Sequence, residues 1–234
     1  MMRIGIFIGG VLFVFSTATA QVRAGFSGGI LLSGAEQIRF YNSKAYSTTT
    51  YFWGGIIDCS ITEGLSVMLT PSYAEKGTYA LPVEVQGYVP KLSFRQTYVE
   101  VPLLLKYSFG STIRPHLVVG STVGVNLSSR VAAEVHGPAL TRIELEADAA
   151  SLVRDFEYSL EFGGGVSYEI DEYIMLTIEG RYSHGLSNIV KKGSVAKLYN
   201  DDFHALQLEN EAVYKSKGFK ISLGLTFPLQ FDDH

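Results

Sequence analysis

The feature that most constrains this chain is a repeated alternation of apolar residues with small or charged ones. The clearest example is YVEVPLLLKY at 98–107, where one set of alternate residues is apolar and the other set contains Glu100 and Lys106. Successive side chains of a β-strand point to opposite faces, so this pattern predicts a strand with one apolar face. Eight segments are predicted as strands: 22–32, 51–61, 65–76, 98–107, 115–127, 158–170, 176–183 and 219–227.

The connections between these segments alternate in length, four long ones of roughly 18–35 residues with three short ones of roughly 3–7 residues. Short turns on one side and long loops on the other are typical of transmembrane barrels. The pattern predicts an all-β fold: an eight-stranded antiparallel up-and-down transmembrane β-barrel with four long outside loops and three short periplasmic turns. Both termini are then expected in the periplasm. A soluble barrel, with its apolar face inside, is the alternative. The abundance of glycine, serine and threonine on the polar faces favours the membrane barrel.

Residues 1–20 are predicted to be a signal peptide, and residues 21–234 an outer-membrane barrel domain. Arg3 precedes an apolar run of about a dozen residues, and Ala18 and Ala20 fit a cleavage site before Gln21. The expected location is the outer membrane of a gram-negative bacterium.

The composition narrows the class of protein further. Hydrophobic residues make up 47% of the chain, which excludes a disordered polymer. The net charge of −4 argues against a nucleic-acid partner. Cys59 is the only cysteine, so the chain has no internal disulfide or multi-cysteine metal site.

Three stretches resemble the outer-membrane β-barrel family related to PorT. They are YVEVPLLLKY, RPHLVVGSTVGVNLS at 114–128 and EGRYSHGLSNI at 179–189, and the closing GFKISLGLTFPL is similar as well. His116 stands where that family usually has an aromatic residue. The resemblance implies an eight-stranded, OmpA-like barrel, and it does not specify a task.

The polar faces place five acids and five bases inside the barrel. The interior of eight strands is just wide enough for side chains to fill, so these groups are expected to pair and plug the lumen. The predicted charge network consists of Glu100, Lys106, Arg114, Glu161, Glu179, Arg181 and Lys220.

The last strand resembles the C-terminal signal that outer-membrane assembly machinery reads, with Gly224, Phe227 and Leu229 at its defining positions. The expected partners are therefore outer-membrane lipid, this machinery, and an envelope or secretion protein.

No catalytic motif, metal-ligand spacing or cofactor motif stands out, and none of these sites is predicted. The preferred function is a non-enzymatic barrel with a structural or accessory role in assembly, secretion or surface interaction. Two alternatives stay open. One is an outer-membrane enzyme acting on lipid or peptide, with His184 or His116 as its base. The other is a small barrel for ligand binding or uptake.

Overall fold

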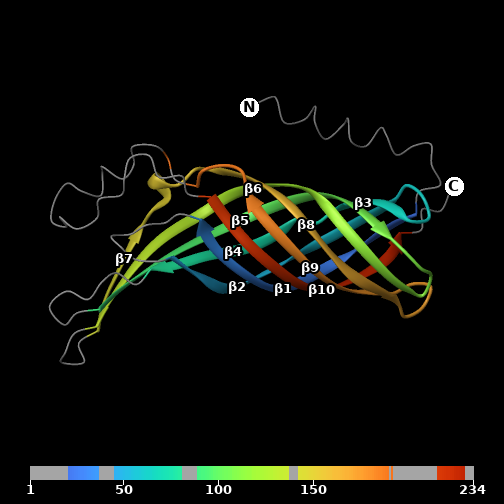
Figure 1. Ribbon diagram of the computed structural model, residues 1–234, viewed down its shortest axis with the longest axis horizontal. Helices are drawn as coiled ribbons and strands as arrows, with labels where there is room; N and C mark the ends of the chain where they lie inside the picture. Colours follow the sequence, from blue (N-terminus) through green and yellow to red (C-terminus); the bar gives the residue numbers. More distant parts are fainter. Residues whose placement is uncertain are drawn as a thin grey trace.

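A computed structural model describes residues 21–36, 45–80, 89–136, 142–189, 191 and 215–229. The segment predicted as a signal peptide lies outside these residues. The described strands form one antiparallel sheet that curls into a barrel (Figure 1). In chain order they are β1 Val22–Glu36, β2 Ala45–Ser60, β3 Leu65–Leu69, β4 Ser72–Ala80, β5 Val89–Ser108, β6 Ile113–His136, β7 Arg142–Asp148, β8 Phe156–Glu169, β9 Met175–Gly185 and β10 Lys215–Leu229.

Eight antiparallel spans close the barrel. β3 and β4 act as one span, because both lie between β2 and β5. They are separated at Thr70 and Pro71, where proline has no N–H to donate to the ladder. β7 pairs with β6 alone, and β1 pairs with β10 to complete the ring. The predicted eight-stranded up-and-down barrel is confirmed.

The barrel has two unlike ends. At one end, residues 61–64, 109–112 and 170–174 make three short turns, and Gly110 supplies a positive φ of 82° in the second. We call this the turn end, and the opposite end, where β7 extends to the left in Figure 1, the loop end.

Several strands are longer than predicted, and one was not predicted at all. β1 and β2 leave only residues 37–44 between them, and β7 lies within the expected long loop after β6. At the loop end the exposed residues of β2 include polar Ser47 and Thr49. A strand that leaves an apolar environment loses the alternation from which it would be recognised.

The two faces of the sheet have opposite polarity. Large apolar side chains are exposed on the outer face, while charged and hydroxyl side chains are buried inside. Along β8 the exposed Tyr158, Leu160 and Phe162 alternate with the buried Ser159 and Glu161. No helix among the described residues is long and apolar enough to cross a membrane.

One irregularity interrupts the β5–β6 ladder. Tyr98 pairs with Asn126 and Thr97 pairs with Ser128, so Leu127 has no partner on β5. Such an extra residue is a β-bulge. On the loop-end side of the bulge, even-numbered residues of β6 point outward, and the exposed residue there is Arg130 rather than an apolar one.

Candidate functional site

A network of charged side chains crosses the middle of the barrel, and Lys220 lies at its centre. Lys220 is on β10 and is only 2% exposed. Its Nζ lies 2.8 Å from Glu100 Oε2 on β5 and 2.8 Å from Glu161 Oε1 on β8. One ammonium group therefore links three strands that are not all neighbours in the sheet.

Lys76 extends the network from Glu100 toward the loop end. Its Nζ lies 2.7 Å from Glu100 Oε1 and 3.0 Å from Glu157 Oε1. The Ser216 hydroxyl donates a hydrogen bond to Glu157. The ammonium also lies 4.8 Å from the centre of the Tyr98 ring, close enough for a cation–π contact.

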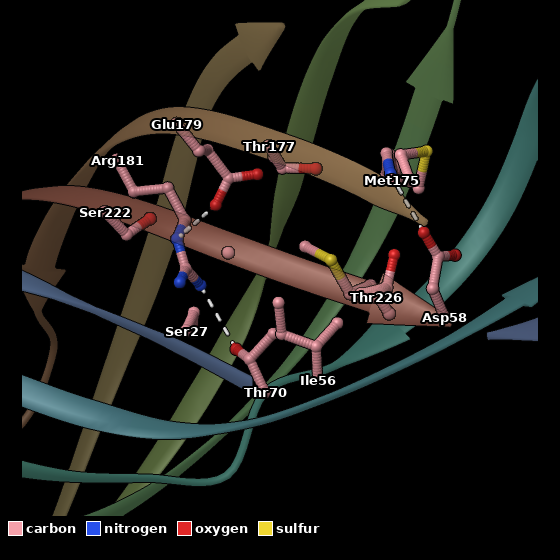
Figure 2. A pocket seen from close by; sticks show the side chains of 13 residues that line it. Ser27, Ile56, Asp58, Thr70, Met175, Thr177, Glu179, Arg181, Ser222 and Thr226 are labelled. Atoms are coloured by element: carbon pink, nitrogen blue, oxygen red, sulfur yellow. Dashed lines mark hydrogen bonds and ion pairs between the residues drawn. The ribbon is translucent and has the colours of Figure 1, made fainter. Parts of the chain in front are cut away.

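Arg181 extends the network in the other direction. Its Nη1 lies 3.2 Å from Glu161 Oε2, and its Nε lies 2.8 Å from Glu179 Oε1. Figure 2 shows Arg181 reaching from β9 between Glu179 and Thr70, whose hydroxyl accepts a hydrogen bond from Nη1 at 3.2 Å. His116 Nε2 lies 3.1 Å from Glu179 Oε2. We call these eight residues the central network: Lys76, Glu100, His116, Glu157, Glu161, Glu179, Arg181 and Lys220.

Two other ion pairs lie nearer the turn end. Lys106 Nζ is 2.8 Å from Asp58 Oδ2, and both side chains are buried. Arg114 Nη2 is 2.9 Å from Glu169 Oε2, and the Arg114 side chain is 37% exposed.

The structure thus places five of the seven predicted network residues in one cluster. Lys106 and Arg114 face inward too, but they belong to the two separate pairs. The predicted network did not include the other three members, Lys76, Glu157 and His116. The signal for Glu157 was present, because it continues the inward series of Ser159 and Glu161 by one step toward the loop end.

Apolar side chains and small cavities complete the interior. Ile56, Met68, Leu104 and Val118 form a buried cluster inside the barrel. The cavity beside Arg181 in Figure 2 has a volume of about 20 Å³, which is space for about one water molecule. Beside Arg181 the side chains therefore leave room for little more than one water molecule.

The last strand carries the predicted insertion signal at the turn end. Gly224 is buried against the interior, while Phe227 and Leu229 are exposed on the outer face. These residues lie on the strand that pairs with β1 and closes the barrel.

The two histidines considered as catalytic bases have different surroundings. His184 lies on the outward phase of β9, and the adjacent Ser183 is buried inside. His116 is buried between Glu179 and Ser167, whose Oγ lies 3.5 Å from His116 Nδ1. No group of three or more His, Cys, Asp or Glu side chains in the described part of the chain is arranged to hold a metal ion.

Comparison with known proteins places the chain among outer-membrane β-barrels. A family model described as "Outer membrane protein beta-barrel domain" matches residues 15–191. No curated protein matches.

Three solved structures are similar in outline, at low sequence identity. OprG from Pseudomonas aeruginosa is 12% identical over 91% of this chain and 96% of its own, with a TM-score of 0.48. Neisserial surface protein A is 13% identical over 91% and 98%, with a TM-score of 0.39. The outer membrane protease OmpT from Escherichia coli is 12% identical over 92% and 99%, also at 0.39.

Proposed function

Since this chain belongs to the family of outer membrane protein beta-barrel domains, we propose that it is a non-enzymatic barrel with a plugged lumen. In this proposal it has a structural or accessory role in the outer membrane of a gram-negative bacterium, in assembly, secretion or surface interaction. The single observation that carries the proposal is the central network.

The network opposes conduction for a physical reason. Glu100, Glu161, Lys220 and Arg181 are each no more than 3% exposed, and they satisfy one another across the lumen. Opening a water path through them would separate buried ion pairs, and loss of one partner of such a pair typically costs about 3–5 kcal/mol.

Planar-bilayer recording of the refolded protein tests the plug. We expect no stable channel openings from the wild-type protein under conditions in which a general porin conducts. A variant with Glu100→Ala, Glu161→Ala, Arg181→Ala and Lys220→Ala should show small openings if it inserts, because the obstruction is removed. Large, stable, porin-like conductance of the wild-type protein would contradict the proposal and favour an uptake barrel.

We also propose that the chain is related to the PorT family, on the sequence stretches that resemble it, and that in its accessory role it contacts another protein of the cell envelope. Chemical cross-linking in intact cell envelopes should trap the chain with another envelope or secretion protein. If it were recovered only as an uncrosslinked monomer while a known envelope complex in the same sample cross-linked, the accessory role would be wrong.

The orientation is part of the same proposal. Residues 1–20 are removed as a signal peptide, and the turn end and both termini face the periplasm. Assembly machinery reads Gly224, Phe227 and Leu229 before the barrel contacts outer-membrane lipid. N-terminal sequencing of the mature protein should begin at Gln21, and a Leu229→Asp variant should accumulate unfolded in the periplasm.

Neither a cofactor nor a nucleic-acid partner has a place in this function.

One arrangement favours a second candidate, an enzyme with His116 as its base. Ser167 and Glu179 flank His116 as a nucleophile and an orienting carboxylate would. All three side chains are buried, so a substrate would have to enter the lumen. Labelling of Ser167 by a fluorophosphonate, abolished in a folded His116→Ala variant, would establish this candidate in place of the first.

A further inference from the structure

We propose that the turn end of the barrel is a binding site for a small oxyanion, held by Arg23. This site goes beyond the structural role proposed above, and its test does not depend on conductance. Three observations carry it: an interior arginine without an ion pair, a cavity that the arginine lines, and a lining rich in hydrogen-bond donors.

Arg23 is a buried cation with almost no partners. It is the second residue of β1, points inward and is only 7% exposed. Its Nη2 donates one long hydrogen bond, 3.4 Å, to the Thr226 carbonyl oxygen. Its Nε is buried and has no hydrogen-bond partner among the described residues.

The neighbouring carboxylates each form an ion pair with another base. Asp58 lies directly opposite Arg23 on β2; its Oδ2 is paired with Lys106, and its buried Oδ1 has no hydrogen-bond partner among the described residues. Glu169 is paired with Arg114. The other five interior bases of the described chain all form ion pairs, namely Lys76, Lys106, Arg114, Arg181 and Lys220. Among the described residues Arg23 is the interior base without an ion pair, and a buried charge without a direct partner is costly.

Arg23 lines a cavity of about 40 Å³ at the turn end. The lining also contains Lys106 and Arg114, together with the hydroxyls of Ser66, Ser108 and Ser167. Lysine and arginine can only donate hydrogen bonds, and a hydroxyl can donate one, so the lining is rich in donors. The acids in the lining are Asp58 and Glu63, of which Glu63 is exposed on the turn at the rim.

This combination fits an oxyanion better than water alone. Water can satisfy Nε, but it does not neutralise the guanidinium. A phosphate, sulfate or carboxylate group does both, and guanidinium groups match its geometry. The cavity exceeds the roughly 10–15 Å³ needed by one water molecule but has no room for a whole metabolite. The ligand is therefore a small free oxyanion, or the terminal anionic group of a molecule that remains outside the rim.

Thermal unfolding of the full mature chain in a zwitterionic detergent tests the site. Inorganic phosphate is titrated at constant ionic strength, with sulfate and acetate in parallel to separate tetrahedral oxyanions from carboxylates. A ligand that binds only the folded state raises the unfolding temperature as its concentration increases. We expect this rise for the wild-type protein, and an apparent affinity about 10-fold or more weaker for Arg23→Gln. Arg154→Gln, which removes an exposed arginine near the loop end, is the matched control and should behave as wild type.

The unfolding temperature without phosphate provides a second readout. Arg23→Gln removes a buried charge that has no ion pair, so it should unfold at the same temperature as the wild-type protein or higher. A large destabilisation of Arg23→Gln in chloride buffer would make Arg23 a structural residue and overturn the proposal. An equal effect of phosphate on both proteins, or no effect on either, would overturn it as well.

Discussion

At the scale of single residues, Lys220 holds the most consequential position. Its ammonium group pairs with two buried carboxylates, those of Glu100 and Glu161. Lys220→Met should therefore lower the free energy of unfolding by about 3–5 kcal/mol, measured by guanidinium titration of the refolded protein in detergent. Lys191→Met, at an exposed pair with Asp155, should change it by less than about 1 kcal/mol.

A combined variant separates the loss of a pair from the loss of packing. In Lys220→Met each carboxylate loses one of its two bases, because Glu100 keeps Lys76 and Glu161 keeps Arg181. Adding Glu100→Gln and Glu161→Gln should therefore recover part of the lost stability. If the triple variant is less stable than Lys220→Met alone, charge compensation is not what Lys220 contributes.

Gly163 is required by close approach of the backbone. A Cβ at this inward position of β8 would clash with the Gly180 carbonyl oxygen and would lie 2.9 Å from Arg181 Cγ. Gly163→Ala should therefore destabilise the barrel by about 1–3 kcal/mol or prevent it from refolding. The matched control is Gly28→Ala, whose Cβ would have its nearest neighbour, the Phe52 carbonyl oxygen, at 3.4 Å. Equal unfolding temperatures for the two variants would contradict this explanation.

The sequence predicts which residues point inward better than it predicts their partners. Alternation places Glu161, Arg181 and Lys220 on the polar face of their strands, and the structure has them inside. Pairing also depends on the stagger between strands, which alternation does not encode. This is why Lys106 reaches Asp58 rather than a member of the central network.

At the scale of elements, the β6 bulge divides the strand into two parts. Leu127 is the extra residue, so its deletion should leave every remaining β5–β6 pair intact and every side chain on its present face. Deletion of Val123, which pairs with Val101 and Tyr158, should invert one part of β6 and expose polar residues to lipid. Heat-modifiable migration in unboiled gel samples should persist for the Leu127 deletion and disappear for the Val123 deletion. The same outcome for both would mean that the bulge does not set the register.

The strand segments were predictable where the environment on both faces is uniform. Where the outer face of the barrel carries large apolar side chains, lipid outside and polar groups inside enforce a strict alternation along each strand. All eight predicted strands lie in this part of the barrel. Beyond this part, the extensions of β1 and β2 and the whole of β7 were missed. Backbone hydrogen bonds hold these extensions in the sheet, and such bonds impose no alternation of apolar and polar residues on the sequence.

At the scale of the whole molecule, the barrel has its polar groups inside and its apolar groups outside. Trp53, the only tryptophan of the chain, is 60% exposed on the outer face beside Tyr73. In vesicles that contain brominated lipid its fluorescence should be strongly quenched, whereas aqueous iodide should have little effect. The urea-unfolded chain should show the reverse. Strong iodide quenching of the folded protein would mean that this face is in water, as it would be in a soluble barrel.

The position of Lys220 on the last strand bears on the order of events in biogenesis. Seven of the spans, β1 to β9, carry the acids Glu100, Glu157, Glu161 and Glu179, but the cation between two of these acids arrives only with β10. Until then, Glu100 and Glu161 are short of positive charge, so an early collapse of the partial sheet is disfavoured. Sealing of the β1–β10 seam and neutralisation of the interior are therefore one step, and a chain that lacks the fifteen residues of β10 is expected to stay open.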